Sequence, residues 1–200
     1  MRPAPRWSFL LMGLLVLIAD PVAAQPPREG LRAGMKELTL AGGYTVSHDI
    51  PSGAGPTVRS VLVMPRLGYV LTDPAGSAPL RGTLEVVGEP FVQLFTDPAE
   101  RAGVGASALL RWIFATGTAF LPYVEGGVGV MGNEDLDIRQ NNCNVNFVVE
   151  GGVGGLVFLG ERWALTGGYR FQHVSNANIC SQNLGINSSL FTLGVSYFFP

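Results

Sequence analysis

The sequence predicts an all-β protein: an eight-stranded antiparallel up-and-down transmembrane β-barrel, preceded by a cleaved signal peptide. Three observations support this prediction. Charged residues make up only 14% of the chain, against about 25% in an average soluble domain. Glycine is abundant, with 27 residues, and aromatic residues reach 10%. Apolar residues recur at every second position rather than at helical spacing, which indicates strands. Together these features are typical of a barrel whose outer face meets lipid.

The N-terminal segment has the features of a secretory signal peptide. Two arginines among the first residues precede an apolar run, Phe9–Ala19, and the small residues Val22–Ala24 follow as a cleavage site. The apolar run is too short for a membrane-spanning helix, which needs roughly 20 residues. We therefore expect residues 1–24 to be removed on export and residues 25–200 to form one barrel domain.

Turn-forming residues divide the mature chain into eight segments of alternating polarity. Each is long enough for a tilted membrane strand, which needs about 9 to 11 residues. The expected strands are Glu37–Ser47, Val58–Thr72, Thr83–Phe95, Gly103–Phe114, Phe120–Met131, Asn146–Leu159, Trp163–Ser175 and Leu190–Phe199.

The alternation also predicts which face of each strand meets lipid. In the last segment Phe191, Leu193 and Val195 share one face, while Thr192 and Ser196 share the other. The charged residues assigned to the less apolar face are Glu85, Glu89, Arg111, Glu125, Glu150 and Arg170. Buried charges are tolerated when they are paired, and the lumen of a small eight-stranded barrel is just wide enough to be filled by side chains. We therefore place the charges in the lumen and the aromatic residues toward lipid.

A repeated motif fits the same arrangement. Val124–Gly129 reads VEGGVG and recurs as Val149–Gly154. We interpret the two copies as adjacent strands that use glycine for curvature and close packing, each glutamate being neutralised by an arginine in the lumen. A catalytic carboxylate is the alternative.

Connection lengths predict the orientation in the membrane. The longer connections are His48–Thr57, Gly132–Val145 and Asn176–Ser189, and the links at the other end of the strands are mostly short. Outer-membrane barrels keep short turns on the periplasmic side and long loops outside. We therefore expect a Gram-negative outer-membrane protein with a periplasmic N-terminus. Its net charge of −2 gives no indication of a nucleic-acid partner.

Cys143 and Cys180, the only cysteines, fall in two of the outer loops. In an exported chain such a pair predicts a disulfide bond, and two free thiols are the alternative. No group of His, Cys and carboxylate residues has metal-ligand spacing, so neither a metal nor another cofactor is expected. His48 is interpreted as an exposed loop residue.

The end of the seventh expected strand carries the strongest candidate for chemistry. Tyr169, Phe171, His173 and Ser175 share one face, and that face is the lipid-facing one. An imidazole that can take a proton from a neighbouring hydroxyl is the minimum requirement for an activated serine nucleophile. The alternative is a polar rim where the strand leaves the membrane.

The segment His173–Ala177, with the sequence HVSNA, is followed by Asn183–Gly185, with the sequence NLG. This arrangement resembles the C-terminal signature of the lipid A 3-O-deacylases, also called acyloxyacyl hydrolases. Further matching pieces are Pro122–Gly129, Asn146–Phe147, Tyr169–Phe171 and Gly194–Tyr197. The resemblance is good over Phe120–Phe199 and weak before it.

The resemblance implies an eight-stranded outer-membrane esterase without a cofactor. Its substrate would be lipid A of the outer-leaflet lipopolysaccharide, from which it would remove the ester-linked acyl chain at the 3-position. Ser175 would be the nucleophile and His173 its general base. Asn176 or Asn183, with backbone N–H groups after Ser175, would stabilise the oxyanion.

The chain departs from the family pattern at Asn187, because the family has there the glutamate that orients the histidine. Three readings follow: Asn187 completes a working triad, an acid is supplied by the facing loop, or the enzyme is inactive. The acids in that loop are Glu134, Asp135 and Asp137. A non-catalytic barrel with a structural or adhesive role is the alternative function.

Overall fold

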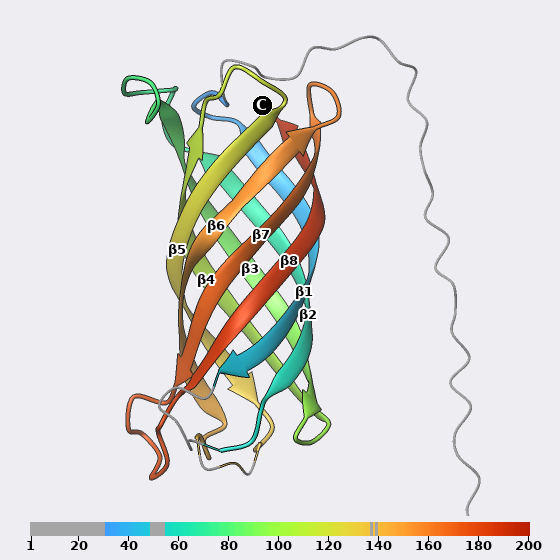
Figure 1. Cartoon of the computed structure of the whole chain (residues 1–200), viewed down its shortest axis with the longest axis vertical. Coiled ribbons are helices and arrows are strands. Elements are labelled where there is room, and N and C mark those ends of the chain that lie inside the picture. Colours follow the sequence, from blue (N-terminus) through green and yellow to red (C-terminus); the bar gives the residue numbers. More distant parts are fainter. Residues whose placement is uncertain (1–30, 49–54, 137, 139) are drawn as a thin grey trace, which may run out of the picture.

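The computed structural model describes residues 31–48, 55–136, 138 and 140–200, so the expected signal peptide lies outside the described residues. Eight antiparallel strands close into a barrel in which β8 pairs back with β1 (Figure 1). The strands are β1 (Lys36–His48), β2 (Arg59–Val70), β3 (Gly82–Asp97), β4 (Arg101–Phe114), β5 (Phe120–Asn133), β6 (Val145–Phe158), β7 (Trp163–Ser175) and β8 (Ile186–Phe199). The predicted fold class is confirmed. In the described part of the chain, no helix is long and apolar enough to cross a membrane.

Two strand boundaries differ from the prediction in a way that affects the site. The prediction began the last strand at Leu190, but β8 begins at Ile186, so that Asn187 is a strand residue. His48, which we expected in a loop, is the last residue of β1 and pairs with Asn187. The segment Asn187–Ser189 is polar, so the hydrophobic pattern does not mark it as strand, although backbone pairing with β1 and β7 continues through it.

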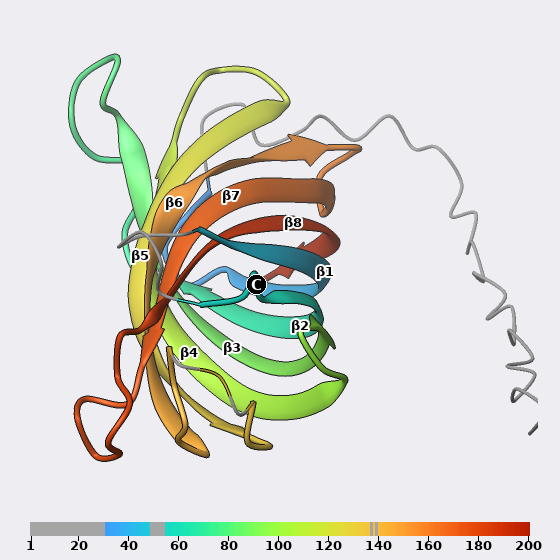
Figure 2. The same cartoon turned by 60° about the horizontal axis from the view of Figure 1, so that its bottom comes forward.

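The two ends of the barrel differ. The β5–β6 and β7–β8 connections project from the same end, at the bottom of Figure 1 and toward the viewer in Figure 2. We call this the loop end. The opposite end, which we call the turn end, carries the short β4–β5 and β6–β7 links. This is the distribution of long and short connections that the sequence predicts.

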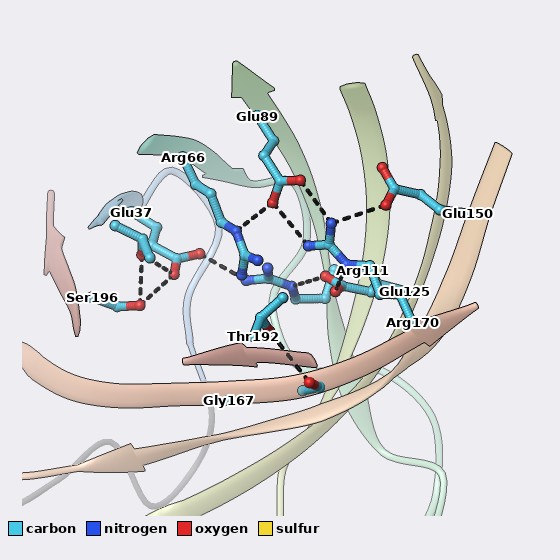
Figure 3. Close-up of polar contacts among 12 residues, drawn as sticks. Glu37, Arg66, Glu89, Arg111, Glu125, Glu150, Gly167, Arg170, Thr192 and Ser196 are labelled. Carbon is cyan, nitrogen blue, oxygen red and sulfur yellow. Dashed lines mark hydrogen bonds and ion pairs between the residues drawn. The ribbon is translucent and has the colours of Figure 1, made fainter. Parts of the chain in front are cut away.

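A layer of ion pairs fills the middle of the lumen (Figure 3). Arg111 contacts Glu37 at 2.8 Å and Glu125 at 2.9 Å. Arg170 contacts Glu89 at 2.7 Å and Glu125 at 2.6 Å. Further pairs join Arg66 to Glu89, Arg111 to Glu85 and Arg170 to Glu150. The predicted lumen position of the charges is confirmed, and the glutamates of the two VEGGVG motifs both pair with a lumen arginine.

Two apolar layers lie on either side of the ion pairs. Toward the loop end Leu62, Met64 and Leu190 belong to one buried cluster. Toward the turn end Leu121 and Phe198 belong to another. The sequence did not predict these layers, because inward-facing apolar residues interrupt the simple polar-in, apolar-out alternation.

The outer surface is a broad apolar band. Large side chains are exposed on every strand, for example Leu40, Val63, Val153 and Leu193. Exposed apolar area of this extent requires a partner, and for a closed barrel that partner is lipid. The predicted outward row of β8 follows the same pattern, with Phe191, Leu193 and Val195 exposed. The expectation that aromatic residues face lipid is wrong for Phe91, Tyr123 and Phe198, which are buried in the apolar layers of the lumen.

Candidate active site

His173 and Ser175 lie at the loop end of β7 and face outward. Val174 between them is buried in the lumen, whereas His173 and Ser175 are half-buried. His173 is the register partner of Val149 on β6 and of Asn187 on β8. Antiparallel pairing therefore sets the three side chains in one row on the lipid-facing surface.

The imidazole of His173 is held by Asn187. Nδ1 of His173 lies 2.7 Å from Oδ1 of Asn187. A carbonyl oxygen only accepts hydrogen bonds, so Nδ1–H is the donor. The other ring nitrogen, Nε2, then carries the lone pair, which is the tautomer that a general base requires.

Gly185 closes the other side of the imidazole. Its φ is +76°, and a Cβ added to it would lie 2.5 Å from Cε1 of His173. The backbone therefore lies directly against the ring, where no other residue fits. Gly185 N–H also donates to the carbonyl of Gln140 in the β5–β6 connection at 3.2 Å. Two loops and β8 thus fix the orientation of His173.

The hydroxyl of Ser175 makes no hydrogen bond to His173 or to any other group among the described residues. The two residues share a face at positions i and i+2, so their side chains are neighbours on the outer surface. Catalytic hydrogen bonds are often long in structures without substrate and shorten when it binds.

The turn after Ser175 is built from asparagines. Asn176 is fully buried, and its amide donates to Gln182 O at 2.7 Å and to Asn141 Oδ1 at 3.1 Å. Its backbone N–H donates to Oδ1 of Asn183 at 2.8 Å. The amide of Asn183 donates to Asn178 at 3.1 Å and keeps a second N–H. The backbone and amide N–H groups of Asn176 are therefore already hydrogen-bonded within the protein. Of the two expected oxyanion donors, only Asn183 keeps an N–H without an acceptor among the described residues.

The backbone of this turn is unusual. Ala177 has φ 51° and Asn178 has φ 63°, a region that alanine rarely occupies. Such strained positions occur at functional sites when the surroundings hold them in place. Here the Asn176 contacts supply that hold, and within the described residues the Ala177 N–H has no acceptor.

The predicted disulfide bond is present. Cys143 in the β5–β6 connection is bonded to Cys180 in the β7–β8 connection, 37 residues away. Gln182 N–H also donates to Oδ1 of Asn142 at 3.1 Å. The loop that carries the turn after Ser175 is thereby tied to the loop that contacts Gly185.

The two acids of the facing loop that the structure describes, Glu134 and Asp135, make contacts with the start of β4. Glu134 accepts a hydrogen bond from Ala102 N–H at 2.8 Å, which ties it to the start of β4. The carbonyl of Asp135 accepts from the Arg101 side chain at 3.0 Å. Asp137 lies outside the described residues. In the described part of the chain, no group of three or more His, Cys, Asp or Glu residues could hold a metal ion.

An apolar groove of about 590 Å³ lies on the outer surface beside the site. Its outward-facing residues are Ala106, Ala108, Val128, Val130, Phe147 and Val149. Phe147 and Val149 on its near edge are the register partners of Ser175 and His173. The groove therefore begins on β6, beside the strand that carries the candidate nucleophile and base, and runs across β5 to β4.

Sequence reasoning missed two features of this surface. The groove has a signal in the sequence, because Ala106 and Ala108 are small residues on a lipid-facing strand side. The contact of Gly185 with His173 has no local signal, since it depends on how the loops are arranged in space. The partnership of His173 with Asn187 is expected from the family resemblance, which puts Asn187 at the position of the residue that orients the histidine.

Comparison with known proteins gives one family. Residues 68–196 match the family model described as lipid A 3-O-deacylase (PagL). A crystal structure of the outer membrane enzyme PagL is 20% identical, with a TM-score of 0.56 over 79% of this chain and 97% of that chain. Neisserial surface protein A is 12% identical, with a TM-score of 0.59 over 84% of this chain and 98% of that one.

The N-terminal barrel domain of Pseudomonas aeruginosa OprF is 16% identical, with a TM-score of 0.52 over 84% of this chain and all of that chain. At these identities the structural likenesses show the barrel fold alone. A comparison with curated protein sequences finds no match.

Proposed function

The chain belongs to the lipid A 3-O-deacylase (PagL) family, and from that premise we propose that Ser175 and His173 hydrolyse the ester bond on the outside of the barrel. The family and the barrel neighbours make the protein an outer-membrane lipid A 3-O-deacylase of the Gram-negative type. The catalytic residues, their roles and the substrate contacts below are our proposal.

One observation carries the proposal: an imidazole in the base tautomer and a serine hydroxyl stand on the lipid-facing surface at the edge of an apolar groove. An ester in the outer leaflet reaches a nucleophile only on this surface, because the lumen is filled by side chains. The groove accommodates the acyl chain, and its start at Phe147 sets the ester carbonyl beside Ser175.

The reaction proceeds by acyl transfer. Oγ of Ser175 attacks the ester carbonyl carbon while its proton passes to Nε2 of His173. The tetrahedral intermediate collapses, the C–O bond to the sugar breaks, and the leaving oxygen takes the proton from His173. Water then attacks the acyl-serine, again through His173, and releases the fatty acid and the free serine.

The oxyanion needs donors at the carbonyl oxygen. The N–H of Ala177 and the second amide N–H of Asn183 are in the right turn and are not engaged by described residues. One such donor contributes roughly 10²- to 10³-fold in rate. Asn176 supports the turn from beneath.

Asn187 takes the position at which the family has glutamate. It holds the same tautomer of His173, which is the geometric part of the acid's role. It carries no charge, so it does not stabilise the imidazolium that forms in the transition state. In a serine protease an Asp→Asn exchange lowered the rate by about 10⁴, chiefly through the wrong tautomer. Here the Nδ1 contact with Oδ1 avoids that fault.

Mass spectrometry of lipid A from cells that express the protein tests the proposal. The expected result is loss of the single acyl chain at the 3-position, abolished by Ser175→Ala and retained in the matched control Ser181→Ala in the same loop. Unchanged lipid A with the wild-type barrel folded in the outer membrane would contradict it and would favour a non-catalytic barrel.

A further inference from the structure

A second set of polar side chains lies on the lipid-facing surface, beside the proposed catalytic residues. Nε2 of His48 on β1 lies 2.8 Å from Oγ of Ser189 on β8. The Ser189 hydroxyl donates to the Tyr169 hydroxyl on β7 at 3.2 Å. We call these three residues the His48 chain.

The middle member of the chain is covered. Ser189 is 6% exposed, and the ring of His48 is parallel to that of Phe171, with centroids 6.4 Å apart. Phe171 is the register partner of Ser189. A substrate carbonyl therefore has no access to Ser189, which excludes it as a second nucleophile and leaves it as a link between two exposed groups.

Counting donors and acceptors shows which hydrogen-bonding group of the His48 chain is left without a partner inside it. With Ser189 donating to Tyr169, the Nε2–H of His48 donates to Ser189, and the Tyr169 O–H proton remains available at the far end. One hydrogen-bond donor, the Tyr169 O–H, is therefore left for a group outside the protein, at a surface where an unpaired polar group is costly.

The His48 chain and the groove lie on opposite sides of the catalytic residues. His48, Asn187, His173 and Val149 form one register row across β1, β8, β7 and β6. Val149 lines the groove at one end of the row. His48 is exposed at the other end.

An ester has two halves, joined at the bond that is cut. With the acyl half in the groove, the alcohol half extends from Ser175 and His173 toward β8 and β1. We propose that the His48 chain binds the sugar half of the substrate by donating a hydrogen bond to one of its oxygens. This inference rests on the proposed function and names the part of the same site that recognises the headgroup.

The sharpest variant is Tyr169→Phe, because it removes one oxygen and keeps the ring that packs against Phe191 at 5.5 Å. Its matched control is Tyr44→Phe on β1. Tyr44 also faces outward, is 43% exposed and is not a member of the His48 chain. Two substrates with the same acyl group are compared: purified lipid A and the methyl ester of the same fatty acid.

The expected result is that kcat/KM for lipid A falls about tenfold relative to that for the methyl ester, chiefly through KM. Tyr44→Phe keeps the wild-type ratio. His48→Phe, which retains a ring over Phe171, lowers the ratio in the same direction. An equal effect of Tyr169→Phe on both esters, or no effect on either, would overturn the inference.

Binding separates this inference from the proposed chemistry. In the Ser175→Ala protein, lipid A in mixed detergent micelles should bind about tenfold more weakly when Tyr169→Phe is added, whether or not the wild type hydrolyses it. Unchanged binding would overturn the inference. Lipid A without phosphates identifies the acceptor: loss of the Tyr169→Phe effect assigns a phosphate oxygen, and a retained effect assigns a sugar oxygen.

Discussion

Nδ1 of His173 lies 2.7 Å from Oδ1 of Asn187, and the two residues are register partners on β7 and β8. A neutral amide therefore occupies the place of a carboxylate without disturbing the geometry of the base.

We expect Asn187→Glu to raise kcat by about tenfold or more, because a carboxylate at this position adds charge stabilisation of the imidazolium. Asn187→Gln, which has the length of glutamate without its charge, is the control and should not raise it. The measurement is initial-rate hydrolysis of lipid A by protein in micelles. A fall in activity with glutamate would mean that the amide of Asn187 has its own role.

Gly185→Ala should lower kcat by about 100-fold while the barrel still folds, because the added Cβ displaces the imidazole and a shift of about 1 Å is enough for such a loss. Gly34→Ala is the control. Its φ is +89°, similar to that of Gly185, but nothing lies within 4 Å of the added atom. Similar losses in both variants would attribute the effect to backbone conformation rather than to His173.

The double variant Cys143→Ser, Cys180→Ser should lose activity at a lower temperature than the wild type. The closed loop of 37 residues contributes about 4 kcal/mol in the loop-closure description, and it ties together the loops that contact Gly185 and carry Asn176. Thermal inactivation is compared with barrel unfolding measured by circular dichroism. A barrel that unfolds with the activity would show that the bond stabilises the whole fold.

Ala108→Phe should reduce kcat/KM for esters with long acyl chains by about tenfold or more and affect short-chain esters less, since it fills the groove. Leu38→Phe, an exposed change on β1 away from the groove, serves as the control. Chain-length profiles of the two variants test this. Identical profiles would place the acyl chain elsewhere.

Arg170→Met should destabilise the barrel by about 3–5 kcal/mol, because Glu89 and Glu150 are left with a buried charge that has lost a partner. Arg59→Met breaks a pair with Asp97 whose side chains are 45% and 46% exposed, and should change stability by less than about 1 kcal/mol. Urea unfolding in lipid vesicles gives both values. A mild effect at Arg170 would indicate that water or protonation compensates within the lumen.

Much of the fold could be predicted, because the period-two pattern indicates the strands and the facing of the charged residues, although not that of the apolar residues in the lumen. Strand alternation, together with the need of buried charges for partners, predicts the lumen position of Glu85, Arg111 and Arg170. Glu37 and Arg66, which join them, were not singled out. His173, Ser175 and the disulfide partners were also identified from the sequence.

The remaining features depend on register between strands far apart in the chain. The sequence pattern ends the first strand before His48. His48 lies beside Asn187 only because β8 pairs with β1. The sequence predicts a loop at Ser189, because a polar run interrupts the alternation. Side-chain contacts such as that of Gly185 with His173 need the three-dimensional arrangement of two loops.

The stacked filling of the barrel has a consequence for the cell. Leucine, methionine and phenylalanine side chains lie above and below the arginine–glutamate pairs in the described part of the chain. These apolar layers oppose the passage of hydrated solutes and ions through the described part of the barrel. We therefore expect cells that make the protein in quantity to keep an intact permeability barrier.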